Sequence, residues 1–190
     1  RRSSDLYEAA IETATETADR LRDAIDDAEG GDTGSLASTL EVATERSAEW
    51  ERDALVERIN TAMDADPEAH DRAGDELLDV LAAVPETDAL DESERALVES
   101  EARNAYCTIR TRGGREALEA GREALATGEY ETARDRFETA VSIVAETVEV
   151  AADGVDVDTA ELATLRTEAE RRYADAQVAL VESVVEAGID

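Results

Sequence analysis

The stretch REALEAGREALATGEYETARDRFETAVSIVAETVEVA, residues 115–151, decides the fold of this chain. Small or apolar residues recur every three or four positions on both sides of Gly128, namely Leu118, Gly121 and Leu125 before it and Tyr130, Ala133, Phe137, Ala140 and Val144 after it. This spacing is typical of one face of a helix. Two such faces joined by a short turn pack antiparallel. The stretch therefore predicts a helical hairpin.

Two glycines and one aromatic residue indicate how this hairpin packs. Gly121 has no side chain and permits a close approach of the second helix, whose Phe137 ring fills the gap. Gly128 can adopt the left-handed conformation that ends the first helix. We therefore expect the hairpin turn at Gly128.

The hairpin resembles a tetratricopeptide repeat, in which glycine and small residues on one helix precede Gly-x-Tyr, alanine and aromatic positions on the next. The matching residues are Gly121, Gly128, Tyr130, Ala133, Phe137 and Ala140, while Ala145 stands where the family usually has proline. The resemblance covers about one unit of a chain that could hold about five. It implies a non-catalytic scaffold that binds protein partners.

Helical periodicity continues outside the hairpin, so the sequence predicts an all-α fold of about seven helices. Five further helices are expected, at 5–28, 35–65, 66–84, 91–112 and 158–187. Gly113 and Gly114 should break the chain before the hairpin, because each glycine costs about 1 kcal/mol inside a helix. The architecture is either a multi-helix bundle or a short helical-hairpin array. We expect one domain, 1–190, with a sub-boundary near 85–91.

Helix starts are marked by polar residues that can bond the free amides of a first turn. Asp66 precedes Pro67, a favoured pair at a helix start. Three pairs have capping-box spacing: Asp5 with Glu8, Asp91 with Glu94, and Asp158 with Glu161.

The charge composition predicts a protein adapted to high salt. The chain has 49 acidic and 19 basic residues, with a net charge of −30, and every basic residue is arginine. Molar salt screens charges over about 3 Å, which makes the self-repulsion tolerable. We therefore expect a halophile, a cytoplasmic location in a high-salt cytosol, and protein partners. At high salt the acidity does not exclude nucleic acid as a partner. The chain could also form a homo-oligomer.

The first residues, Arg1 and Arg2, are not preceded by methionine. We expect a tag, a removed domain or a membrane anchor before them. The main alternative to a scaffold is accordingly a regulatory or sensory helical bundle attached to a missing N-terminal segment.

Catalytic signals are weak, and we predict no catalytic residue, metal, cofactor or small-molecule substrate. The single cysteine, Cys107, excludes an intramolecular disulfide and is expected to be a small buried residue. His70, the single histidine, is expected on the solvated surface. The acidic turn 152–161 lacks the order of ligands of an EF-hand. An enzyme would need a pocket joining Cys107, His70 or the arginines to a cofactor.

The segment IRTRGGR, residues 109–115, is a basic spot in this acidic chain. Arg110, Arg112 and Arg115 bracket the two glycines, and guanidinium groups bind carboxylates and phosphates in pairs of hydrogen bonds. The three arginines are therefore candidate partner-binding residues. Alternatively, they pair with the chain's own acids.

The first prediction concerns salt. Circular dichroism should show the helix content rising between about 0.1 M and 2 M KCl, because salt screens the repulsion among the carboxylates. Full helicity that does not change with salt would contradict the halophile hypothesis.

Overall fold

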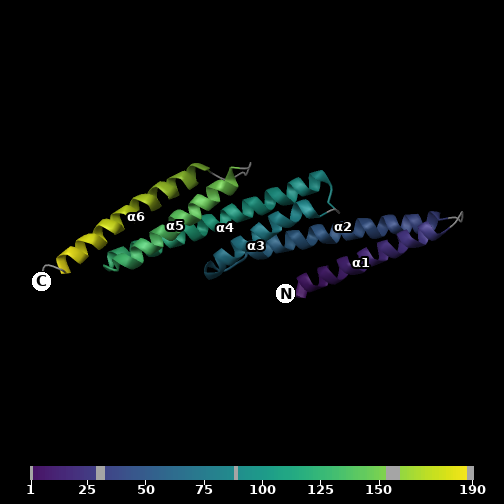
Figure 1. Ribbon diagram of the computed structural model, residues 1–190, viewed down its shortest axis with the longest axis horizontal. Coiled ribbons are helices and arrows are strands. Elements are labelled where there is room, and N and C mark those ends of the chain that lie inside the picture. Colours follow the sequence, from purple (N-terminus) through teal and green to yellow (C-terminus); the bar gives the residue numbers. More distant parts are fainter. Residues whose placement is uncertain (1, 29–32, 88–89, 153–158, 188–190) are drawn as a thin grey trace. The chain divides into compact units, whose positions relative to one another are not determined.

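The computed structural model describes residues 2–28, 33–87, 90–152 and 159–187. These residues form six α-helices, two 3-10 turns and no strand (Figure 1). The α-helices are α1 (Arg2–Asp27), α2 (Gly34–Met63), α3 (His70–Ala83), α4 (Glu92–Ala126), α5 (Tyr130–Ala151) and α6 (Thr159–Ala187). The turns are η1 (Pro67–Ala69) before α3 and η2 (Val84–Glu86) after it. The predicted all-α class is confirmed.

The described helices number six rather than about seven because the predicted break at Gly113 and Gly114 is wrong. Helix α4 runs without interruption through both glycines. A Cβ on Gly114 would lie 3.2 Å from Val144 of α5 and 3.5 Å from Leu165 of α6. Gly114 therefore gives close contact with two helices instead of a turn, and this packing outweighs its low helix propensity.

The described helices fall into two compact units, each made of separate chain segments. Unit 1 comprises residues 1–61 and 78–102, and unit 2 comprises residues 62–77 and 103–190. Their boundaries lie inside α2, α3 and α4. The expectation of one domain with a sub-boundary near 85–91 stays a prediction.

Unit 1 has a core of small and branched apolar residues. Val80, Val84 and Val98 are almost fully buried, with exposed fractions of 1% or less. On α1 the least exposed positions recur every three or four residues and include the buried Ala14 and Ala18. This spacing is that of a single packed helix face.

In unit 2, α4 and α5 form the predicted hairpin around Gly128. Gly128 has a φ of +81°, which is the left-handed conformation expected of it. The amide of Glu129 donates to the Ala124 carbonyl at 2.9 Å, and the amide of Gly128 donates to the Leu125 carbonyl at 3.2 Å. These two bonds make a Schellman motif, which satisfies the carbonyls at the end of α4.

Phe137 packs directly on Gly121. The ring is fully buried, and a Cβ on Gly121 would lie 2.5 Å from the Phe137 Cε1 atom. The other residues on the inner face of α5, Ala133, Ala140 and Val144, are also fully buried. The predicted contact between Gly121 and Phe137 is therefore present.

Helix α6 packs along α5 in the opposite direction (Figure 1). It is also joined to α4 by two ion pairs, Arg115 with Glu161 and Arg122 with Glu168. Both partners advance by seven residues from one pair to the next, so α4 and α6 run in the same direction. Three helices of unit 2 thus contact one another, and Gly114 lies where they meet.

The predicted helix starts have mixed outcomes. The capping box of Asp91 and Glu94 is confirmed, because each backbone amide donates to the other residue's carboxylate, at 3.1 and 2.8 Å. Asp5 is not a cap, since α1 already begins at Arg2. Pro67 does open a helical turn, but the Asp66 side chain makes no capping hydrogen bond. Asp158 lies outside the described residues.

The second prediction compares two glycines of α4. Gly113→Ala should raise the free energy of unfolding by about 1 kcal/mol, because alanine is the better helix former and a Cβ there has no neighbour closer than 3.8 Å. Gly121→Ala should lower it by about 1 to 3 kcal/mol, because the new methyl group collides with the Phe137 ring.

Urea titrations of both variants in molar KCl measure the two free energies. Gly113→Ala is the matched control, since it makes the same chemical change in the same helix. Equal effects of the same sign would contradict the close contact at Gly121.

Candidate functional site: an acidic groove around Arg110

Arg110 points to a different side of α4 from Arg112 and Arg115. It lies two and five positions from them, and residues at those spacings do not share a helix face, whereas Arg112 and Arg115 are three positions apart and do. Arg110 pairs with Asp71 and Glu146, Arg115 pairs with Glu161, and Arg112 is exposed without an ion pair among the described residues. The structure therefore does not bring the three guanidinium groups together. Two of them bind the chain's own acids, as the alternative interpretation expected.

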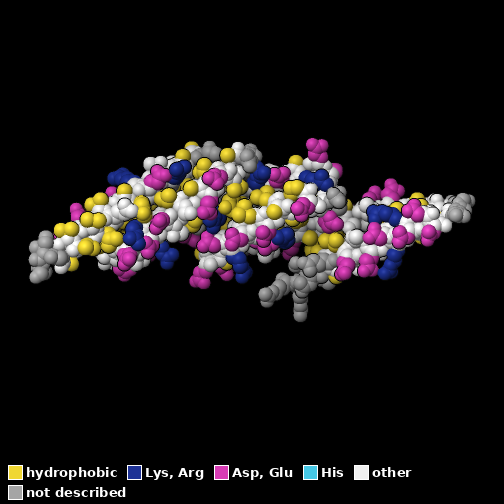
Figure 2. Space-filling view, viewed as in Figure 1, with side chains coloured by type: hydrophobic (Ala, Val, Ile, Leu, Met, Phe, Trp, Pro, Cys, Tyr) yellow, Lys and Arg dark blue, Asp and Glu magenta, His cyan; other side chains and the backbone are white. Residues whose placement is uncertain are grey.

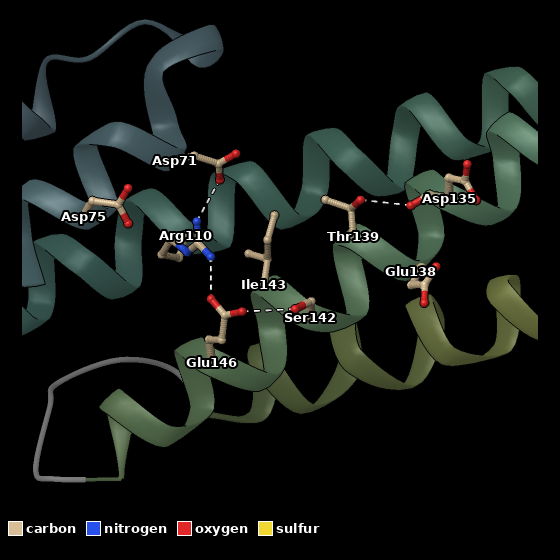
Figure 3. Close-up of a pocket in the computed structure, with 9 residues that line it drawn as sticks. All are labelled: Asp71, Asp75, Arg110, Asp135, Glu138, Thr139, Ser142, Ile143 and Glu146. Atoms are coloured by element: carbon tan, nitrogen blue, oxygen red, sulfur yellow. Dashed lines mark hydrogen bonds and ion pairs between the residues drawn. The ribbon is translucent and has the colours of Figure 1, made fainter.

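Arg110 is held by carboxylates from two other helices of unit 2. Its Nη1 donates to Asp71 Oδ1 of α3 at 2.7 Å, and its Nη2 donates to Glu146 Oε2 of α5 at 2.6 Å (Figure 3). Only 12% of the Arg110 side chain is exposed. Such short, charge-assisted bonds at a nearly buried guanidinium fix its position. Arg110 thus ties α3, α4 and α5 together.

Two neighbouring residues, Gly74 and Tyr106, lie beside the Arg110 side chain. A Cβ on Gly74 would lie 2.9 Å from the Arg110 Cδ atom, so the glycine leaves room for the arginine stem. The Arg110 Cζ atom lies 6.0 Å from the centre of the Tyr106 ring, at the outer limit of a cation–π contact. Burial raises the pKa of the Tyr106 hydroxyl, although the guanidinium of Arg110 acts in the opposite direction.

The groups around Arg110 keep its guanidinium protonated. Burial alone would lower the pKa of Arg110, but Tyr106, Glu146 and Asp71 outweigh burial and hold the pKa above its usual value. The guanidinium therefore stays charged at every physiological pH. Its Nε atom is buried and has no hydrogen-bond partner among the described residues.

Arg110 forms part of the wall of an open groove of about 570 Å³ in unit 2. Figure 3 shows the lining side chains, which come from α3, α4 and α5. They are Asp71, Asp75, Arg110, Asp135, Glu138, Thr139, Ser142, Ile143 and Glu146. The lining thus contains five carboxylates and one guanidinium, which give the groove a net charge of −4.

The carboxylates of the groove differ in how they are engaged. Asp71 and Glu146 hold Arg110, and Asp135 accepts from the neighbouring Arg134 at 2.6 Å. Asp75 and Glu138 make no direct ion pair in the part of the chain that the structure describes, although Glu138 lies near enough to Arg134 to help Asp135 raise the pKa of that arginine. These two side chains are therefore the ones in the groove that can accept a cationic group from a partner.

Cys107 is buried, as predicted. Its side chain is fully enclosed in unit 2, and its thiol faces the Thr147 carbonyl oxygen at 4.0 Å. Burial raises the pKa of the thiol to about 11. Since the thiolate is the reactive form, this cysteine is unreactive at neutral pH.

The prediction for His70 is wrong, because the residue is buried rather than solvated. Only 6% of it is exposed, and its Nδ1 atom lies 3.2 Å from Glu116 Oε2, although the two are not aligned as a hydrogen bond. Gly113 of α4 lies beside His70, because a Cβ on Gly113 would be at an ordinary contact distance of 3.8 Å from the His70 Cβ. His70 and Cys107 are not among the residues that line the groove.

Metal binding finds no support in the described ranges, where no three acidic, histidine or cysteine residues are grouped to hold an ion. The acidic turn 152–161 lies mostly at 153–158, outside the described residues.

The groove could not be found from the sequence. Asp71 and Glu146 are 39 and 36 residues from Arg110. In a chain with 49 acids no local pattern distinguishes them. Gly74 gave the one usable signal, because a glycine inside a helix suggests close approach of another group.

Comparison with known proteins gave no relatives, since no family model, no curated protein and no solved structure matches the chain. A search of the described helices for one long and apolar enough to cross a membrane also found none.

Proposed function

We propose that this chain is a non-catalytic protein-interaction scaffold of tetratricopeptide-like type, and that the groove around Arg110 receives a positively charged side chain of a partner. The observation that carries the proposal is the groove itself. It is an open hollow with a net charge of −4, and a nearly buried Arg110 fixes its walls.

The packing of unit 2 supports the scaffold. Phe137 lies on Gly121 between α4 and α5, and α6 then packs on both helices of that hairpin. A hairpin followed by a helix that covers both of its members is how helical repeats stack into an array. Such arrays bind their partners on grooved surfaces between helices.

The charges of the groove define the partner's chemistry. Asp75 and Glu138 make no direct ion pair with a described residue, so an incoming arginine or lysine can pair with either of them without displacing Arg110. Phosphate and carboxylate groups would be repelled there. Outside the groove, Arg112 is exposed and has no ion pair with described residues, so it is the predicted arginine best placed to bind an acidic group of the same partner.

We also propose that the scaffold works in a high-salt cytosol. Its support is the composition, 49 acids with arginine as the sole basic residue type. In molar salt, long-range attraction of a basic partner is screened, and contacts inside a hollow are screened less. Recognition under these conditions depends on a shaped groove rather than on the overall charge.

The third prediction tests the groove with two fluorescent peptides, one rich in arginine and one with glutamine at the same positions. The double variant Asp75→Asn and Glu138→Gln should weaken binding of the arginine peptide by about tenfold in anisotropy titrations at about 1 M KCl. The glutamine peptide should bind neither protein.

The matched control is Glu123→Gln with Glu149→Gln. It removes the same charge from two exposed side chains of unit 2 that have no ion pair with described residues. An equal loss of affinity in this control would show that only the net charge matters. Unchanged affinity in the groove variant would remove the groove from the binding surface.

A further inference from the structure

The C-terminal part of α6 carries an apolar surface that no described residue covers. Val178, Val181, Val184 and Val185 are 58%, 62%, 64% and 54% exposed. Figure 2 shows hydrophobic side chains gathered along this end of the molecule. A cluster of four exposed valines within eight residues differs from the scattered single apolar residues of an ordinary surface.

Val184 lies on a part of α6 that extends beyond the helix it packs against. Helix α6 has 29 residues and α5 has 22. The buried residues of α6 end at Ala176, whereas the helix continues to Ala187. Val184 is therefore exposed because α6 extends beyond α5 (Figure 1).

The valines are spaced to receive another helix. Ala174, Val178, Val181 and Val185 follow one another at intervals of four, three and four residues. Alternating spacings of three and four residues are typical of the contact line, or seam, between two helices packed side by side. The seam runs along a different face from the buried Leu162, Leu165 and Ala169, which contact the rest of unit 2.

The charges beside the seam specify the partner helix. Between Tyr173 and Ala187 the chain has three acids, Asp175, Glu182 and Glu186, and no basic residue. A second copy would bring the same three acids to the contact and no basic residue to pair with them. A helix whose apolar stripe is flanked by lysine or arginine would instead be attracted.

We propose that this seam, Val178, Val181 and Val185 with its flanking acids, docks an amphipathic helix with basic flanks from a partner protein. The inference rests on the proposed scaffold function and adds a second contact surface to it. The partner's apolar stripe packs on the valines, and its basic residues pair with Glu182 and Glu186. The segment Ala174–Ala187 is 14 residues long, so about four helical turns are available for the contact.

The fourth prediction uses two synthetic helical peptides with the same leucine stripe, one flanked by lysine and one flanked by glutamate. The full chain should bind the lysine-flanked peptide and not the other one. Val181→Gln with Val185→Gln should weaken that binding by about tenfold or more. Glutamine is a better helix former than valine, so the variant should keep its helicity and melting temperature.

The matched control is Val42→Gln with Leu97→Gln, which replaces two apolar residues of similar exposure, 54% and 58%, elsewhere in the chain. It should leave the affinity unchanged. Glu182→Gln with Glu186→Gln should weaken binding of the lysine-flanked peptide, because it removes the acids that its lysines contact.

Three results would overturn the inference: no binding of either peptide, equal binding of both peptides, or a loss in the control equal to that of the valine variant. A fourth contradicting result would come from sedimentation velocity. If the chain is a dimer and the variant Val181→Gln with Val185→Gln is a monomer, the seam binds a second copy of the chain. The groove variant Asp75→Asn with Glu138→Gln separates the two proposals. If the groove variant no longer binds the arginine peptide while neither helical peptide binds the seam, the scaffold proposal stands and the proposal for the seam is wrong.

Discussion

The contact between the Phe137 ring and Gly121 is the constraint on which the rest of unit 2 depends. It lets α5 approach α4 closely enough to bury the alanines on the inner face of α5. Gly114 lies seven residues earlier on α4, on the same face, and gives the same freedom to Val144 and Leu165. Two glycines two turns apart thus provide a narrow strip of backbone against which two helices pack.

Close packing matters more here than in an ordinary core, because the apolar side chains are small. The chain has one phenylalanine, one tryptophan and one methionine. Alanine buries little area, so its contribution depends on close approach of the backbones. The arginines reinforce this arrangement from outside: Arg110 joins α4 to α3 and α5, while Arg115 and Arg122 join α4 to α6. Arg110 contributes most among them, since exposed pairs are worth little.

The sequence predicted the features that depend on neighbouring residues. The hairpin turn at Gly128, the capping box of Asp91 and Glu94, and the close contact of Phe137 with Gly121 all follow from local spacing. The predicted break at Gly113 and Gly114 is wrong because propensity favours a break there, whereas the packing of Gly114 against Val144 and Leu165 favours a continuous helix. The burial of His70 and the carboxylates around Arg110 depend on residues distant in the sequence, and no local pattern reports such contacts.

A double-mutant cycle on Gly121→Ala and Phe137→Ala tests the central contact most directly. Phe137→Ala alone should cost about 3 to 5 kcal/mol, because it leaves a cavity between the helices. In that background Gly121→Ala should cost nothing or stabilise, because its methyl group enters the space that the ring has left. Urea unfolding of the four proteins in molar KCl should therefore give a coupling free energy above about 1 kcal/mol. Free energies that add within about 0.5 kcal/mol would mean that the two residues do not touch, and would contradict this account of the fold.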